Sequence, residues 1–326
     1  SCSNTLYYNM RQCITVCGKE EVMIRVIGLG DNVVDCNYTT KVIYPGGNSY
    51  NFAVMAKRLG YDSAYAGVIG NDWQADEIVA LLERENVDIS HCHYESGETG
   101  VCGIHLTNGD RTIVEENDAG VVKAKPYQVT EKEIEYLRQF DLVHSSCYSH
   151  IENQLKKVKD AGISVLYDFS DEWTEETLSE ICANITIAFF SGKDLAIEDL
   201  EKLVKKCVNE YGCELAITTF GERGAMVYNG RKLYKKQPYN YEAPIVDTTG
   251  AGDSWITAFI TSYFSGMKIF AHLHSHKFEN FSRKIDQDDY VDHLIEFSMC
   301  SGNLFARHNC LMEGSLGYGI KFEEGR

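Results

Sequence analysis

The sequence predicts an α/β fold, with a mostly parallel central sheet covered by helices on both faces and a small second sheet that forms a lid. Through residues 23–219, short apolar runs of strand length alternate with amphipathic runs of helical spacing. Such alternation with short connections indicates βαβ units, whose strands lie parallel in one sheet. Two Asn-Gly pairs interrupt the alternation and indicate hairpins.

Each main-sheet element follows from its own pattern of apolar residues. Strands are expected at 23–27, 64–69, 141–144, 163–167, 185–190 and 214–219. Helices are expected at 52–59, from a cap at Asp72 through Leu82, near 151–161, at 175–183 and at 194–211. Gly60 and Gly212 directly follow two of these helices, and glycine in that position commonly ends a helix.

The two Asn-Gly pairs predict hairpin turns, because both central positions of such a turn need positive φ. Asn108-Gly109 separates the extended segments 101–106 and 111–115, and Asn229-Gly230 separates 224–228 from 232–235. With the extended segment 36–44, the first hairpin is expected to form a small sheet outside the main one. This sheet is the predicted lid, drawn from about 36–46 and 97–116.

Three regions are expected along the chain. Residues 1–22 are polar and aperiodic and are interpreted as a peripheral N-terminal extension. Residues 23–326 form the α/β domain with its lid. Within it, residues 267–290 are charged, His-rich and aperiodic, which predicts an exposed insertion.

The composition restricts the kinds of partner. A formal net charge of −17 disfavours nucleic acid and anionic membrane surfaces, since like charges repel. No apolar run is long enough to span a membrane, and the first residues lack the order of a signal peptide. The 12 cysteines are scattered without paired zinc-type spacing, which favours reduced thiols and a cytoplasmic protein.

The strongest functional signal is the run Gly250-Ala251-Gly252-Asp253. Behind it, apolar residues from Ile256 to Phe264 recur at helical spacing, which predicts a helix that Gly266 ends. Small residues before a helix expose backbone N–H groups that, with the helix dipole, bind anions. Asp253, in the first turn, could accept the proton of a hydroxyl that lies in line with a bound phosphate.

Two motifs together resemble those of the ribokinase-like (PfkB) carbohydrate kinases. The run Asp247-Thr-Thr-Gly-Ala-Gly-Asp253 resembles the second signature of that family, and Gly46-Gly-Asn-Ser-Tyr-Asn-Phe-Ala53 resembles the first. Ser49 stands where the family usually has Gly, Ala or Pro. The resemblance covers about residues 23–326. It implies a ribokinase-like three-layer sandwich and ATP-dependent phosphorylation of a sugar hydroxyl, with Asp253 as catalytic base and Gly250, Ala251 and Gly252 as the anion hole.

The same resemblance implies where the ligands bind. Substrate hydroxyls are expected at Asp31, Gly47, Asn48 and Asn51. The nucleotide is expected at Thr219, Gly221 and Gly224, which match a Thr-x-Gly-x-x-Gly loop, and at Thr248.

Metal-ion sites are also implied, though less directly. Mg²⁺ must accompany ATP, and Asp194 is the acidic residue that remains where many relatives have Asn-x-x-Glu. The backbone around Asp247 and Thr249 resembles a K⁺-binding loop of some relatives.

The substrate is predicted from segments outside the shared motifs. The segments 87–93 and 168–173, with His144 and His150, resemble fructoselysine 6-kinases, which implies phosphorylation of the 6-hydroxyl of a fructosamine, with Asp171 near the lysine part. A homodimer formed through the lid is also expected. The alternatives are another sugar kinase of the family, such as a fructokinase or a ribokinase, and a catalytically silent sugar-binding regulator.

Other kinds of site are disfavoured by the sequence. The run 28–33 mimics a dinucleotide-binding fingerprint, but Val33 replaces the third glycine and no helix follows directly. There is no Walker A motif. The alternating His272, His274 and His276 are interpreted as a solvated run rather than a metal site.

Overall fold

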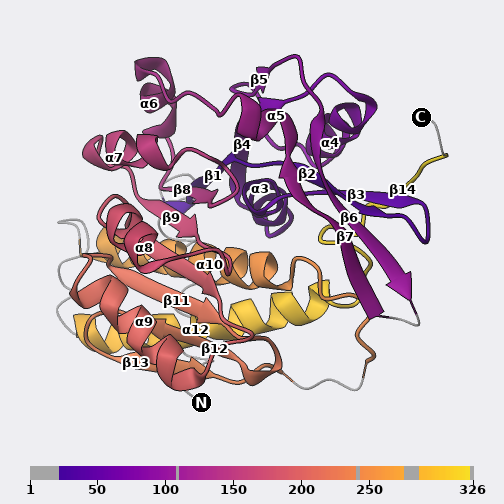
Figure 1. Ribbon diagram of the computed structural model, residues 1–326. Helices are drawn as coiled ribbons and strands as arrows, with labels where there is room; N and C mark the ends of the chain where they lie inside the picture. The colour runs from indigo at the N-terminus through magenta and orange to yellow at the C-terminus, as the bar shows by residue number, and fades with distance from the viewer. Residues whose placement is uncertain (1–21, 108–109, 240–242, 275–285, 324–326) are drawn as a thin grey trace.

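The main sheet runs through the centre of the computed structural model, which describes residues 22–107, 110–239, 243–274 and 286–323 (Figure 1). In spatial order its strands are β13 (Leu233–Lys236), β12 (Ala225–Tyr228), β11 (Leu215–Thr219), β10 (Ile187–Ser191), β9 (Val165–Asp168), β8 (Leu142–Ser146), β1 (Arg25–Gly30), β4 (Asp62–Ile69) and β5 (His93–Tyr94). From β11 through to β5 in this spatial order, each strand is parallel to its neighbour. Strands β12 and β13 add an antiparallel hairpin at the β11 edge. The predicted mostly parallel sheet is confirmed.

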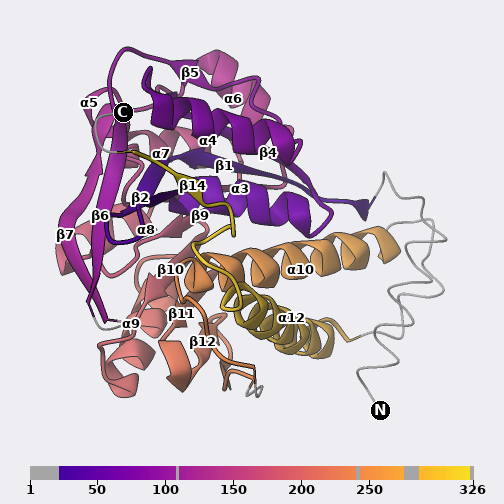
Figure 2. The ribbon, with the colours of Figure 1, turned by 90° about the vertical axis from the view of Figure 1, so that its right-hand side faces the viewer.

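Helices cover both faces of this sheet, because the strands are apolar on both sides. One face is covered by α3 (Asn48–Arg58), α10 (Ala251–Leu273) and α12 (Gln287–Asn309), which share a buried cluster with the strands (Figure 2). The other face is covered by α5 (Gly120–Ala124), α6 (Glu131–Leu137), α7 (Glu152–Asp160), α8 (Glu175–Cys182) and α9 (Ile197–Asn209). Of the helices that the structure describes, none is both long and apolar enough to cross a membrane.

A smaller sheet stands beside the main one, as predicted (Figure 1), while the Asn108-Gly109 turn lies outside the described residues. Its order is β14 (Ile320–Lys321), β3 (Val42–Gly46), β2 (Val33–Asn37), β6 (Thr99–Thr107) and β7 (Asp110–Ala119). Helix α4 (Trp73–Arg84) packs in a buried cluster with Val34 and Ile43 of this sheet. Asp72 caps α4 as predicted, since its side chain accepts a hydrogen bond from the Ala75 N–H.

The prediction of an exposed insertion at 267–290 is wrong at both ends of that range. Helix α10 continues past Gly266 to Leu273, and α12 begins at Gln287. Gly266 does not end the helix but allows α12 to approach, because a Cβ there would lie 2.3 Å from Leu294 Cδ1. Residues 275–285 lie outside the described residues, as do residues 1–21 of the predicted N-terminal extension.

Candidate active site

The predicted site residues lie where the parallel strands of the main sheet end. Asp31 follows β1, Asp168 is the last residue of β9, and Thr219 is the last residue of β11. Helices α3 and α10 begin at the same edge of the sheet, with Gly47 and Gly250 as their N-caps. In open α/β sheets ligands bind at the carboxyl ends of the strands, so the topology itself selects this edge.

Asp31 is buried and held by three serines. Its Oδ1 accepts hydrogen bonds from the hydroxyl groups of Ser49 (2.7 Å), Ser146 (2.8 Å) and Ser149 (2.9 Å) and from the Ser49 N–H (3.1 Å). All of these bonds converge on Oδ1, whereas Oδ2 lies beside Gly47, where an added Cβ would be 2.9 Å away. One oxygen therefore anchors the carboxylate, and the other is directed toward the loop that begins α3.

Ser49, the position that departs from the first signature, has a defined role here. Its hydroxyl group donates to Asp31, and its backbone oxygen lies so close to β1 that a Cβ at Gly28 would be 2.0 Å from it. A Gly, Ala or Pro at this position would lack that hydroxyl donor.

Asn48 connects the start of α3 to a second buried carboxylate. Its Nδ2 donates to Asp168 Oδ2 at 3.0 Å, and the Ser170 N–H donates to Asp168 Oδ1 at 2.7 Å. Burial raises the pKa of Asp168 well above its usual value, and the negative charges of Asp253 and Asp31 raise it further.

The Gly-Ala-Gly run has the geometry of an anion-binding helix start. Gly250 has φ 71°, a left-handed conformation, and a Cβ on it would lie 2.6 Å from that of Ser315. The Ala251 N–H donates a hydrogen bond to the backbone oxygen of Thr248. The Ser254 N–H donates one to the backbone oxygen of Gly250. The backbone N–H groups of Gly252 and Asp253, between these two, belong to the first helical turn, where no intrahelical acceptor is available.

Asp253 is half-buried in this first turn. Its Oδ2 accepts a hydrogen bond from Asn51 Nδ2 at 2.7 Å. Burial raises the pKa of Asp253 to about 7, the hydrogen bond from Asn51 lowers it, and the charges of Asp31 and Asp35 raise it. A carboxylate with such a pKa is suited to accept a proton near neutral pH.

The loop after β11 places the predicted nucleotide residues beside the anion hole. An added Cβ on Gly252 would lie 4.0 Å from Thr219 Oγ1. Gly221 and Gly224 both have positive φ and border a short 3₁₀ turn, η1 (Gly221–Arg223). Thr248 is exposed and contributes its backbone oxygen to the turn before α10.

Comparison with known proteins identifies the family. The model of the pfkB family of carbohydrate kinases matches residues 17–273. The chain belongs to this family. It is therefore an ATP-dependent sugar phosphotransferase, and a regulator without catalysis is set aside.

Similar proteins support the same assignment. The chain is 37% identical to fructosamine kinase FrlD of Bacillus subtilis (strain 168) over 74% of its own length and 84% of that protein. It is 29% identical to fructoselysine 6-kinase of Escherichia coli (strain K12), over 74% of this chain and 90% of that protein. The structure of ribokinase from Giardia lamblia has the same fold, with a TM-score of 0.71, 17% identity, and coverage of 90% of this chain and 95% of that one. The predicted ribokinase-like fold with a lid sheet is confirmed.

The two predicted metal-ion residues of this kinase occupy different settings. Asp194 is exposed on the loop after β10. Asp247 Oδ1 accepts from the N–H and the hydroxyl group of Thr249, and Oδ2 accepts from the Gly314 N–H at 3.0 Å. Within the described ranges, no three His, Cys, Asp or Glu side chains are arranged to hold a metal ion. The Asp247 side chain thus links the anion hole to the loop 310–319.

Arg223 fixes the Asp194 loop to the nucleotide loop. Its Nη2 donates to the backbone oxygens of Gly192 (3.1 Å), Lys193 (2.6 Å) and Leu195 (2.9 Å). Arg223 occupies one of the unspecified positions of the Thr-x-Gly-x-x-Gly loop. No local pattern reveals it, because its partners lie about thirty residues earlier in the chain.

Two of the histidines that entered the substrate prediction, His91 and His144, have packing roles in the structure. His144 is buried and stacks on Phe52, with ring centroids 4.6 Å apart, and burial lowers its pKa to about 4. His91 stacks on Tyr136. These ring contacts give His91 and His144 a packing role that does not involve a substrate.

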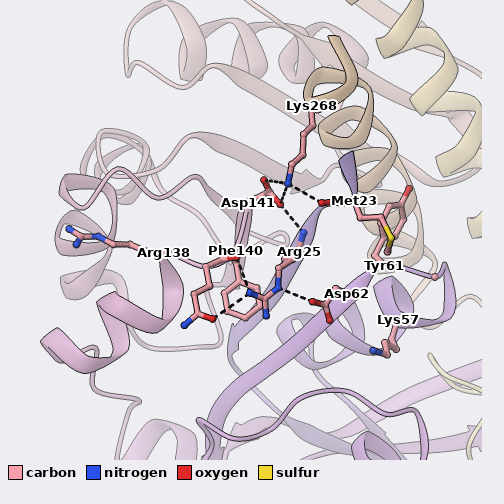
Figure 3. A pocket seen from close by; sticks show the side chains of 11 residues that line it. Met23, Arg25, Lys57, Tyr61, Asp62, Arg138, Phe140, Asp141 and Lys268 are labelled. Atoms are coloured by element: carbon pink, nitrogen blue, oxygen red, sulfur yellow. Dashed lines mark hydrogen bonds and ion pairs between the residues drawn. The ribbon is translucent and has the colours of Figure 1, made fainter. Parts of the chain in front are cut away.

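A separate hollow of about 620 Å³ lies at the opposite, amino-terminal edge of the sheet (Figure 3). Its charged groups are largely paired with one another, including Arg25 Nε with Asp62 at 2.8 Å and Lys268 Nζ with Asp141 at 3.0 Å. Arg25 also lies over the ring of Phe140. The predicted site residues all lie at the other edge, so this hollow is not the candidate active site.

Proposed function

We propose that this kinase phosphorylates the 6-hydroxyl of a fructosamine such as fructoselysine. The observation that carries the substrate proposal is a group of neighbouring carboxylates at the site, Asp31, Asp168 and Asp253. In the part of the chain that the structure describes, their hydrogen-bond donors are amides, hydroxyls and backbone N–H groups, and no Lys or Arg. A substrate that carries an amine would supply the missing positive charge.

Asp253 is proposed as the base in this reaction. As the sugar hydroxyl oxygen attacks the γ-phosphorus of ATP, Asp253 takes the hydroxyl proton, the bond to the bridging oxygen breaks, and ADP leaves. The backbone N–H groups of Gly250, Ala251 and Gly252 are proposed to face the transferred phosphoryl group, although Ala251 first has to release Thr248.

The sugar is proposed to bind between the start of α3 and the end of β1. Asp31 Oδ2 and the amide groups of Asn48 and Asn51 offer both acceptors and donors for its hydroxyl groups. Gly47 leaves room there, because its missing side chain would collide with Asp31.

ATP is proposed to bind along Thr219, Gly221, Gly224 and Thr248. Mg²⁺ would neutralise its phosphates, and an exposed carboxylate on a fixed loop, Asp194, suits a contact through water. For K⁺, the proposed ligands are backbone oxygens around Asp247 and Thr249. The Thr249 oxygen already accepts a bond from Asn309 Nδ2 at 2.9 Å.

The lysine part of the substrate is proposed to extend past Asp171. Asp171 is exposed, follows β9 closely, and accepts a hydrogen bond from the Ser170 hydroxyl at 3.2 Å. The two fructosamine-type kinases among the relatives support this choice of substrate. A homodimer through the lid sheet remains a further proposal, which light scattering with and without sugar would test.

The test compares fructoselysine and fructose side by side in a coupled assay of ADP release. We expect kcat/KM for fructoselysine to exceed that for fructose by at least about tenfold, because fructose leaves buried carboxylates without a cationic partner. Equal or better turnover of fructose would remove the fructosamine assignment and leave a sugar kinase of other specificity. Ribose and nucleosides complete the panel.

A further inference from the structure

The loop 310–319, which follows α12, is fixed on both sides of a buried serine. The Gly314 N–H donates to Asp247 Oδ2 at 3.0 Å, and the Leu316 oxygen accepts from Arg58 Nη1 at 2.8 Å. Between them Ser315 is fully buried and packs against Gly250 of the anion hole. Its side chain therefore has a defined position next to the site.

Two consecutive hydrogen bonds lead from this serine to the proposed base. Ser315 Oγ donates to Asn51 Oδ1 at 3.0 Å, and Asn51 Nδ2 donates to Asp253 Oδ2 at 2.7 Å. Asn51 is 4% exposed, so water has little access to replace either bond.

The order of donors and acceptors in this chain matters for Asp253. An ionised carboxylate only accepts hydrogen bonds, so Asn51 stabilises it only while its NH₂ group points that way. If the amide turns over, its oxygen faces the carboxylate oxygen, and the ionised form is disfavoured. A hydrogen bond to Oδ1 restrains that rotation and satisfies the buried amide oxygen.

We propose that Ser315 is a positioning residue that holds the Asn51 amide with its NH₂ group toward Asp253 and thereby keeps the base in its carboxylate form. The inference rests on the proposed role of Asp253 as base. Ser315 itself touches neither the transferred group nor the sugar. A simpler role, in which Ser315 is only a small residue that fits against Gly250, makes different predictions.

Other charged groups also act on Asp253, and they are unchanged by a substitution at 315. Asp31 follows β1, Asp35 lies on β2, and Asp168 ends β9. Burial raises the pKa of Asp253 most, and the charges of Asp31 and Asp35 raise it further; burial and the charge of Asp253 in turn raise the pKa of Asp168. A change in the pH profile of a Ser315 variant therefore reports on the Asn51 contact.

The experiment measures kcat/KM against pH for the wild type and for Ser315→Ala. We expect the acid limb of the variant to move to higher pH by about half to one unit, because the carboxylate form loses a hydrogen bond. The loss of kcat/KM relative to wild type should then be largest at low pH and become smaller as the pH rises. An unchanged limb, or an equal loss at every pH, would overturn the positioning role.

A double-mutant cycle tests whether Ser315 acts through Asn51. In an Asn51→Ala background, adding Ser315→Ala should leave the acid limb where it is, since the amide is already gone. A further shift of the same size would overturn the proposed route. Ser298→Ala is the matched control, because that serine is buried in α12 and its hydroxyl group makes no hydrogen bond to the described residues. We expect its acid limb to match wild type.

The dependence on the proposed base is tested separately. If Asp253→Asn retains activity, the assignment of the base fails. If Asp253→Asn is inactive and Ser315→Ala has a wild-type limb, only the positioning role fails. Thermal unfolding of each variant identifies a general loss of folding.

Discussion

The two edges of the parallel sheet carry similar side chains and use them in opposite ways. At the amino-terminal edge, Arg25 pairs with Asp62, and Lys268 pairs with Asp141 (Figure 3). At the carboxyl-terminal edge, burial and the charges of Asp253 and Asp31 raise the pKa of Asp168, and the hydrogen bonds that the structure describes for these three carboxylates come from neutral donors.

The difference supports the proposal that the ligands bind at the carboxyl-terminal edge. Charges that neutralise one another stabilise the fold and need no partner. Carboxylates held close together in a partly buried site are unfavourable for stability, and such groups are common where catalysis or binding uses them. The parallel strands position both the paired charges and the group of carboxylates, because each strand contributes one end to each edge of the sheet.

The largest expected effect is that of Asp253→Asn. Turnover should fall by about 10²–10⁴, because the variant retains the shape of the site but not the base. Binding of ADP and sugar, measured by calorimetry, should be retained. The same change at the other edge, Asp62→Asn, is the control and should leave kcat within about twofold, as for a surface substitution. Near-normal turnover of Asp253→Asn would contradict the assignment of the base.

The pH dependence should place the acid limb of kcat/KM near pH 7, the value that burial gives Asp253. The base works when ionised, so a raised pKa means that activity is lost as the pH falls through about 7. Two units below that value, roughly a hundredth of the base remains ionised, and the rate should fall to the same extent. A limb near pH 4, the usual value for a carboxyl group, would show that another group controls the profile.

Arg223→Ala should act on ATP rather than on sugar. Without the guanidinium group, the backbone oxygens of Gly192, Lys193 and Leu195 lose their common donor, and the loop that carries Asp194 is released. We expect KM for ATP to rise about tenfold, equivalent to one charge-assisted hydrogen bond, with KM for the sugar nearly unchanged. Arg138→Ala, at the amino-terminal edge, is the matched control. Equal increases in both KM values would contradict a specific role in nucleotide binding.

The smallest expected effect concerns stability at the amino-terminal edge. Asp141 accepts bonds from Lys268 Nζ and from the Arg25 N–H. Asp141→Ala should lower the free energy of unfolding by about 1–2 kcal/mol, a value reduced by the partial exposure of the pair. Urea denaturation measures this, and kcat should not change. Asp160→Ala, which removes an exposed pair with Lys156, should cost less than about 0.5 kcal/mol. If the two variants lose the same stability, the edge pairing has no special role.

Local sequence determined the elements of the fold and predicted the centre of the proposed site. The apolar runs, the Asn-Gly turn at 229–230 and the Asp72 cap depend on residues close in the chain, and the structure confirms them. Gly250 to Asp253 could be proposed as an anion hole for the same reason, since they form one turn of backbone at the start of a helix.

The tertiary structure decided what no local pattern contains. Gly266 reads as the end of a helix, yet its role depends on Leu294 in another helix. The beginning of α12 was missed because its first turn is charged and exposed, and its buried residues appear only farther along.

The same holds for the finer features of the site. Ser146 and Ser149 reach Asp31 across more than a hundred residues, Ser315 reaches Asn51 across 264, and Asn48 reaches Asp168 across 120. A hydrogen bond between such positions leaves no periodic signal, because its two residues meet only after the sheet has formed. The sequence by itself therefore predicted a base and an anion hole for this kinase, and only the folded chain decided which side chains hold these residues in place.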